Sequence, residues 1–295
     1  MKNTLVILVL PLVVATTANA QTDPQYFNQQ GPGIKPAIFS EGTISMPTQF
    51  EFGATYSKDR KEFFYGVEIS GKAETRYTRF ENGKWTTPVK LLVHDVYSYN
   101  DPFLSPDQQR LYFISDRSLT GEGAKKDYDI WYVQRKDGKW SDPINAGPGI
   151  NTSGNEYYMS FTKSGKMFFS SNGRTGSKNN YDIYSSEFKD GKFQPAVPAG
   201  AGVNTEHYEA DVFVAPDESY LVFAANRPGG LGSGDLFVSF KQGDGSWSTA
   251  RSLGNTINTD TDDFCPYVSP DGKYLFYASR GDVYWVSTEV VMNMR

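Results

Sequence analysis

The chain has 295 residues, with 29 lysines and arginines against 34 acids and a formal net charge of −5. No basic run is long enough to follow a phosphate backbone, which argues against nucleic acid as a partner. Aromatic residues make up 15% of the chain, beside 28 glycines and 16 prolines, and this balance favours many short strands joined by tight turns.

The first twenty residues are typical of a secretory signal peptide. Lys2 precedes an apolar run over residues 5–14 and the small-residue ending Ala18-Asn19-Ala20, which predicts cleavage before Gln21. The apolar run is too short to span a bilayer. The residue directly after the predicted cleavage site is Gln21 and not a cysteine, so no lipid anchor is expected there. We therefore expect an exported protein without a membrane anchor, in a periplasm or outside the cell. The single cysteine, Cys265, allows no internal disulfide and is expected to be a buried, inert thiol.

Two short segments precede the main body of the chain. Residues 21–35 are rich in Gln, Asn, Pro and Gly without apolar periodicity, which predicts a flexible lead-in. Residues 36–45 are predicted to form a strand that has no partner strand within its own repeat.

The rest of the chain is a repeat. Similar turn-and-strand segments align at Asp59, Asp107, Ser164, Asp217 and Asp271, with steps of 48, 57, 53 and 54 residues. A period of this size indicates one supersecondary unit per copy, arranged in a stack or around an axis.

Each complete repeat predicts four strands, which the third copy shows at 156–161, 166–171, 181–188 and 192–197. A Pro-Asp-Gly type of turn joins the first two strands. Asn-Gly or Asp-Gly hairpins precede the fourth strand, and an aromatic residue follows each of them, at Trp85, Trp140, Phe193 and Trp247.

The fifth repeat ends before any such hairpin and therefore lacks a fourth strand. The unpaired strand at 36–45 supplies it if the array closes into a ring, which removes exposed sheet edges. We predict a single all-β domain over 36–295, a five-bladed β-propeller closed by an N-terminal strand. Its blades are expected at 46–95, 96–150, 151–203, 204–257 and 258–295.

These repeats resemble the TolB-type, WD40-like propeller family. The resemblance rests on the SPDGK-x-LYF cores, the following SDR or NRPGG, the DIW, DIY or DLF strands, and the GINT linker at 149–152. It covers roughly residues 36–290, and this chain has no room for the separate N-terminal domain of TolB itself. The resemblance implies a propeller and no particular activity, because fold and function are separable.

Acids recur at the start of the predicted first strands, eight residues before each aligned turn position. The five positions hold Glu51, Tyr99, Glu156, Glu209 and Asp263, and two further acids, Asp101 and Asp211, follow within the strands. One mouth of the channel is therefore expected to be rich in carboxylates. This pattern fits a cation or glycan site, but it fits a ring of structural ion pairs better.

Four arginines recur at the ends of the second strands: Arg117, Arg174, Arg227 and Arg280. Because they recur once per repeat, we interpret them as structural ion pairs. Pairing with the acid of the next blade joins them to Glu156, Glu209, Asp263 and Glu51, respectively. The alternative joins them within each blade to Asp129, Asp182, Asp235 and Asp282.

Other chemistry finds little support in the sequence. His207, with Glu206 and Glu209 nearby, falls short of the three or four ligands of a zinc site, and no calcium-loop or nucleophile-elbow motif occurs. We expect no metal and no cofactor. The predicted loops between Arg117 and Tyr128 and between Arg174 and Tyr181 are long and polar, which is compatible with a partner-binding groove or with tolerated insertions.

Two functions from different classes remain. The favoured one is a monomeric, non-catalytic exported scaffold that presents a loop-bearing face to an envelope protein or glycan. The alternative is a carbohydrate-active enzyme, a glycosidase or lyase, that uses carboxylates at the channel mouth. The best asymmetric cluster for either function is Tyr99, Asp101, His207, Glu209 and Asp211.

Overall fold

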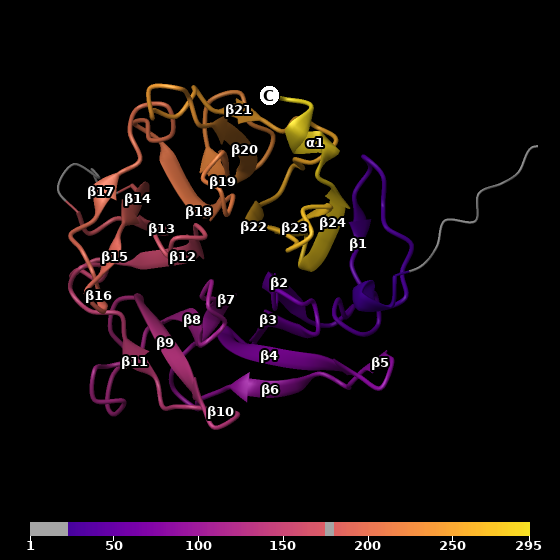
Figure 1. The fold of residues 1–295 in the computed structure, drawn as a ribbon, viewed down its shortest axis with the longest axis vertical. Coiled ribbons are helices and arrows are strands. Elements are labelled where there is room, and N and C mark those ends of the chain that lie inside the picture. Colours follow the sequence, from indigo (N-terminus) through magenta and orange to yellow (C-terminus); the bar gives the residue numbers. More distant parts are fainter. Residues whose placement is uncertain (1–22, 175–179) are drawn as a thin grey trace, which may run out of the picture.

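The computed structural model describes residues 23–174 and 180–295. The predicted signal peptide lies outside the described residues. Five antiparallel sheets of four or five strands are arranged around a central axis, which confirms the predicted five-bladed propeller (Figure 1). In each blade the strands run outward from the axis in chain order, except in the fifth. No helix in the described ranges is long and apolar enough to cross a membrane.

Four strands make up the body of each blade, and they are named from the axis outward. Blade 1 contains β2 (Phe50–Tyr56), β3 (Glu62–Ile69), β4 (Lys72–Glu81) and β6 (Val89–Leu92), and blade 2 contains β7 (Asn100–Leu104), β8 (Arg110–Ser115), β9 (Asp129–Lys136) and β11 (Ile144–Asn145). Blade 3 contains β12 (Glu156–Phe161), β13 (Met167–Ser171), β14 (Asp182–Ser186) and β17 (Val197–Pro198), and blade 4 contains β18 (Tyr208–Val214), β19 (Tyr220–Asn226), β20 (Asp235–Phe240) and β21 (Arg251–Ser252). Blade 5 contains β22 (Asp263–Val268), β23 (Tyr274–Ser279), β24 (Asp282–Ser287) and β1 (Ala37–Ile38).

The outer strands begin later than the sequence predicts. In blade 3, residues 192–193 form β16 (Lys192–Phe193), which pairs back with β15 (Phe188–Lys189) as a separate hairpin. The true fourth strand is β17, which pairs with β14. Similar short strands, β5 (Lys84–Trp85) and β10 (Lys139–Trp140), extend β4 and β9. Pro88, Pro143 and Pro195 separate hairpin and outer strand in blades 1 to 3, because proline has no N–H to continue the ladder.

The ring closes as predicted. Ala37 and Ile38 of β1 pair with Trp285 and Tyr284 of β24, and the Phe39 amide donates to the carbonyl of Val283 at 2.7 Å. A short helix, α1 (Glu289–Met292), follows β24. The free edge of β24 is therefore covered by chain from the other end of the sequence.

The predicted flexible lead-in is in part a packed segment. Residues 24–26 form the 3-10 helix η1 (Pro24–Tyr26), and the Tyr26 side chain is only 1% exposed. Tyr26 packs edge-on against Tyr274, with ring centroids 4.9 Å apart, and Phe27 stacks on Trp85 at 4.3 Å. Two aromatic residues among polar ones are therefore enough to fix this segment against blades 1 and 5.

In the linkers that lead into blades 3, 4 and 5, an asparagine side chain bonds the backbone of the preceding blade. The amide of Asn151 accepts from the Ile130 N–H and donates to the Ile130 carbonyl, both at 2.9 Å. Asn204 makes the same pair of bonds with Ile183, and Asn258 makes them with Leu236. Each linker asparagine therefore extends the third strand of the preceding blade.

The closing junction uses a shorter version of this device. Ser45 replaces the asparagine, and its hydroxyl accepts from the Val283 N–H at 3.2 Å. The Ile44 side chain is fully buried, as are Ile150 and Val203 in other linkers. Residues 44–46 therefore act as a fifth linker, which the sequence pattern does not reveal because serine stands in for asparagine.

Candidate functional site

Every inner strand contains a β-bulge at the same position. The bulged residues have positive φ angles and are Gly53 (57°), Asp101 (48°), Tyr158 (33°), Asp211 (49°) and Cys265 (51°). The strand registers shift next to each of them. A bulge re-aims the local side chain, and positive φ at non-glycine residues is a strain that often marks functional sites. The five bulges encircle the axis, so the side chains of the four that are not glycine approach one another in the channel.

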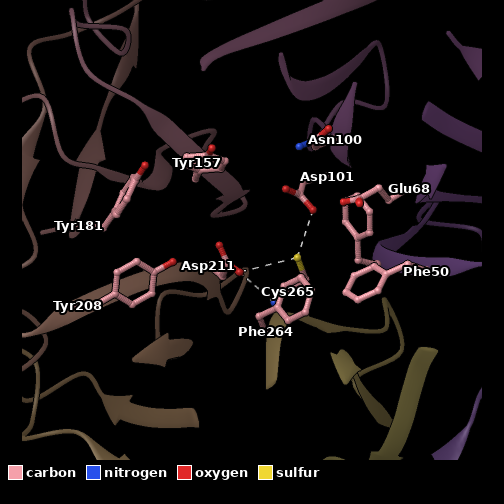
Figure 2. A pocket seen from close by; sticks show the side chains of 11 residues that line it. Phe50, Glu68, Asn100, Asp101, Tyr157, Tyr181, Tyr208, Asp211, Phe264 and Cys265 are labelled. Atoms are coloured by element: carbon pink, nitrogen blue, oxygen red, sulfur yellow. Dashed lines mark hydrogen bonds between the residues drawn. The ribbon is translucent and has the colours of Figure 1, made fainter. Parts of the chain in front are cut away.

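A pocket of about 440 Å³ lies above these bulges, at the face where the inner strands begin, which we call the upper face. Its lining residues are Phe50, Phe52, Glu68, Asn100, Asp101, Tyr157, Tyr181, Tyr208, Asp211, Phe264 and Cys265. They come from all five inner strands, from β3, which carries Glu68, and from the segment before β14, which carries Tyr181. Figure 2 shows the two aspartates and the cysteine between the tyrosines on one side and Phe50 and Glu68 on the other.

The pocket floor joins side chains from opposite blades. The Cys265 thiol of blade 5 donates to Asp101 Oδ1 of blade 2 at 3.1 Å, and its sulfur lies 3.8 Å from Asp211 Oδ2 (Figure 2). The Cys265 amide also donates to Asp211 Oδ2, at 3.3 Å. Gly53 makes room for this arrangement, because a Cβ there would lie 2.5 Å from Asp101 Oδ1.

Aromatic residues close the channel beneath the floor. The hydroxyl of buried Tyr158 crosses from blade 3 to donate to the Pro266 carbonyl at 2.9 Å. Further down, the Tyr267 ring lies 5.7 Å from Phe103 and 5.9 Å from Phe213, measured between centroids. The pocket is therefore a blind cup that opens at the upper face.

The floor groups hold their protons more strongly than isolated side chains do. Burial, and then the nearby Asp211 charge, raise the pKa of Asp101. Burial is also the main cause that raises the pKa of Asp211. Burial and the two carboxylates raise the pKa of the Cys265 thiol well above its usual value. The thiol is therefore a hydrogen-bond donor at neutral pH and not a nucleophile.

The wall of the cup is aromatic. Tyr157 lies 5.3 Å from Tyr181, and Tyr181 lies 5.5 Å from Tyr208, so the three rings form a row across blades 3 and 4. Phe264 faces them from blade 5, with its ring 6.2 Å from that of Phe50. Phe50 and Tyr208 are 41% and 37% exposed, so their rings remain available to a ligand.

The recurrent strand-start acids do not line this pocket. The side chains of Glu51, Glu156, Glu209 and Asp263 are fully buried. Thr152 donates to Glu156 through its amide at 2.9 Å and its hydroxyl at 2.7 Å, and Thr205 and Thr259 bond Glu209 and Asp263 in the same way. These carboxylates hold the linkers, which corrects the expectation that they enrich the channel mouth.

Glu51 is held less completely than its counterparts. The Met46 amide donates to Glu51 Oε2 at 3.2 Å, whereas Oε1 is buried without a hydrogen-bond partner among the described residues. Burial raises the pKa of Glu51 to about 7.

The predicted asymmetric cluster is only partly assembled. Asp101 and Asp211 meet at Cys265. Tyr99 is buried between blades 1 and 2, with its ring 5.3 Å from that of Phe113. His207 lies at the surface, 3.9 Å from Glu206. In the described ranges no three His, Cys, Asp or Glu residues are placed to hold a metal ion.

The four arginines do not follow either predicted pairing. Arg227 bonds Glu209 of its own blade at 2.9 Å, and Arg280 bonds Asp260 in the preceding linker at 2.9 Å. Arg174 donates to the Ile150 carbonyl and lies over the rings of Phe169 and Tyr184. Arg117 lies 5.6 Å from the centre of the Trp131 ring. These side chains contact linkers, carboxylates and rings of the second and third strands. Their partners differ from blade to blade, and the shared structural role stays a prediction.

The loop between Arg117 and Tyr128 is tied to the blade beneath it. Lys125 bonds Asp116 and Lys126 bonds Asp129, both at 2.7 Å, and the Tyr97 hydroxyl donates to the Gly123 carbonyl. The other long loop contains residues 175–179, which lie outside the described residues. The predicted groove between the two loops therefore stays a prediction.

Sequence reasoning missed the aromatic wall and Cys265. Tyr157 and Phe264 directly follow the recurrent acids, and Cys265 aligns with Asp101 and Asp211. The signal was present as a break in the repeat, because these positions vary between blades, whereas four of the five neighbouring strand-start positions hold an acid.

Among known proteins, this chain is similar in structure to TolB and to other propellers, but no sequence family matches it. No model of a known protein family matches the chain, and no curated protein matches it. Among solved structures, TolB from Acinetobacter baumannii matches 82% of this chain with a TM-score of 0.50 and 14% identity, and this chain spans 55% of that TolB chain. A protein of unknown function from Dyadobacter fermentans matches 88% of this chain and 83% of its own, with a TM-score of 0.52 and 14% identity.

Enzyme structures occur among the matches as well. Hydrazine synthase from Kuenenia stuttgartiensis matches 85% of this chain and 80% of its own, with a TM-score of 0.50 and 14% identity. At these identities the likeness supports a TolB-like propeller fold alone.

Proposed function

We propose that this protein is an exported, non-catalytic binding propeller that receives its ligand in the cup on the upper face. The observation that carries this proposal is the blind cup itself, with a polar floor and an aromatic wall. Cavities of about this volume with few, convergent polar groups are typical of ligand sites. A glycan, or a side chain inserted by an envelope protein, is of suitable size for this cup.

The rest of the molecule supports the scaffold role. Recurrent polar groups bond to linkers and neighbouring side chains, as Glu209 does to Thr205 and Arg227. The cup residues, in contrast, differ from blade to blade. A unique site on a repeated frame is the arrangement expected where the frame provides stability and one mouth provides recognition.

A substitution that fills the cup with a large side chain tests the proposal. The mature chain, residues 21–295, is screened for binding to a glycan array and to purified envelope proteins, beside Asn100→Trp and Glu206→Trp. Asn100 lines the cup, whereas the Glu206 side chain is 83% exposed outside it. We expect Asn100→Trp to abolish binding and Glu206→Trp to leave it unchanged. Binding that survives Asn100→Trp would place recognition on another surface.

The Asp101 and Asp211 pair favours a second candidate, a glycosidase or lyase. Both carboxyl groups have raised pKa values, and one oxygen of each lies within 3.8 Å of the same sulfur. A pair of carboxyls in unequal environments can divide acid and base roles. Product analysis on bound glycans decides between the two functions. Turnover that disappears in Asp211→Asn, with folding intact, would establish the enzyme.

A further inference from the structure

We propose that the cup selects an organic cation with an alkylammonium head, such as a quaternary ammonium group. This inference rests on the proposed function, because it names the ligand class of the same site. Three carboxyl groups line the cup, from Asp101, Asp211 and Glu68, and no lysine, arginine or histidine of the described ranges lines it. The cup therefore gathers negative charge as these carboxyls ionise, without a counter-charge from the described residues.

The floor of the cup has few hydrogen-bond donors for its oxygen atoms. The Asp101 side chain belongs to a residue that is only 6% exposed, and the one hydrogen bond found for its carboxylate within the described ranges comes from the Cys265 thiol. Asn100 Oδ1 is buried without a hydrogen-bond partner among those same residues. An unpaired buried acceptor such as Asn100 Oδ1 is costly. A bound cation would attract this oxygen and the Asp101 carboxylate electrostatically.

The rings of the wall are also unoccupied by the protein's own cations. Lysine and arginine side chains lie over several rings elsewhere, for example Arg60 over Tyr26 and Arg135 over Trp140. Within the described ranges, none of the cation–π contacts involves the six rings that line the cup. Aromatic cages with available faces bind quaternary ammonium groups through the negative face of the ring.

Other ligand classes fit the same surfaces less well. An anion would meet three carboxyls and, among the lining residues, no positive side chain. A bare divalent ion prefers six or more oxygen ligands, and the cup offers mainly apolar rings. A neutral sugar can stack on the tyrosines, but it leaves the charge of the floor uncompensated.

The proposal also predicts how the affinity for the cation changes with pH. The groups that face the cup are Asp101, Asp211, Glu68, Cys265, Tyr157, Tyr181 and Tyr208. The cysteine and the three tyrosines have raised pKa values and stay neutral in the physiological range. The two aspartates, with their raised pKa values, gain charge as the pH rises. Binding of a permanently charged cation should therefore tighten with increasing pH and release protons from the floor.

Calorimetric titration of the mature protein with choline and with its uncharged isostere, 3,3-dimethylbutan-1-ol, tests the inference. We expect choline to bind at least about tenfold more tightly than the isostere, which is the scale of a desolvated cation–π and charge interaction. Choline should also bind more tightly at pH 8 than at pH 6. Equal affinity for the two compounds, or tighter choline binding at pH 6, would overturn the inference.

Single substitutions test the contributions of the floor and of the wall of the cup to choline binding. Asp101→Asn and Tyr181→Leu should each weaken choline binding by about tenfold, whereas Glu206→Gln should leave it unchanged. Tyr181 is a half-buried wall residue, so its variant keeps the test open if Asp101→Asn fails to fold. Unchanged choline affinity in a folded Tyr181→Leu protein would contradict the inference.

The same titrations distinguish the two proposals. A neutral glycan that binds, and that Asn100→Trp excludes, while choline does not bind, would overturn the cation and leave the cup as the binding site. If neither ligand class, nor any protein from the screen, responds to Asn100→Trp, both proposals are wrong.

Discussion

At the scale of single residues, the buried carboxylates show which polar groups build the fold. Glu209 receives three donors, from the amide and hydroxyl of Thr205 and from Arg227. Glu156 also receives three, with Ser171 in the place of the arginine. A fully buried carboxylate is tolerated only when donors replace the lost water. The acids of blades 3, 4 and 5 recur because each holds the same kind of linker, so their recurrence carries no information about a ligand.

Two of the four second-strand arginines pair with a carboxylate, and the burial of these pairs differs enough to predict different energies. Arg227 and Glu209 have side chains 13% and 0% exposed, and removal of one partner leaves a buried charge. Arg227→Met should therefore lower the free energy of unfolding by about 3 kcal/mol. Arg280 and Asp260 are 54% and 83% exposed, so Arg280→Met should cost less than about 0.5 kcal/mol.

Urea unfolding of the two variants and the wild type measures this difference. Both substitutions remove one guanidinium from the end of a second strand, so each serves as the control for the other. Equal losses in the two proteins would show that burial does not decide the energy of these pairs.

At the scale of elements, the sequence predicts what the blades share and misses what distinguishes them. The period, the turns and the unpaired strand at 36–45 were sufficient for five blades and their closure. The bulges at Asp101, Asp211 and Cys265 were not predictable, because a register shift depends on how neighbouring inner strands meet at the axis. Tyr181 lies outside the inner strands, so only the assembled ring brings it to the cup.

The linker asparagines should behave as parts of their strands. Asn258 is 3% exposed and bonds both the N–H and the carbonyl of Leu236. Asn258→Ala leaves the Leu236 N–H unpaired, whereas the Leu236 carbonyl keeps its bond from the Leu253 amide at 2.9 Å. The substitution should therefore cost about 1–3 kcal/mol in unfolding free energy. Asn180→Ala, which removes one exposed bond to the Glu206 carbonyl, should cost less than about 0.5 kcal/mol.

Thermal and urea unfolding of both variants provide the comparison. Hydrogen exchange adds a local readout, since the Leu236 amide should lose protection in Asn258→Ala. A protected Leu236 amide in that variant would mean that water or a neighbouring group replaces the side chain, and would contradict this role for the asparagine.

At the scale of the whole molecule, the two ends of the chain hold the ring together. Residues 37–39 cover the edge of β24 in blade 5, and residues 44–46 form the last linker into blade 1. Phe39 is fully buried and lies 5.2 Å from the Trp285 ring and 5.4 Å from the Phe63 ring. The segment therefore joins the first and last blades through both backbone and side chains.

Loss of this segment should open the ring. A chain that begins at residue 46 exposes the edge of β24 and uncovers the rings that Phe39 and Tyr26 cover. Unpaired strand edges promote association between chains, and loss of Phe39 alone is worth about 3–5 kcal/mol. We therefore expect the truncated protein to unfold at a lower temperature and to form oligomers, measured by calorimetry and by light scattering.

A peptide that spans residues 23–45 separates loss of closure from general damage. Added in excess to the truncated chain, it can pair with β24 and fill the aromatic site, so it should restore the monomer and raise the unfolding temperature. The same peptide with Phe39→Ala keeps the backbone bonds and loses the ring, and should restore much less. A truncated chain that stays monomeric with the wild-type unfolding temperature would show that the ring does not depend on this closure.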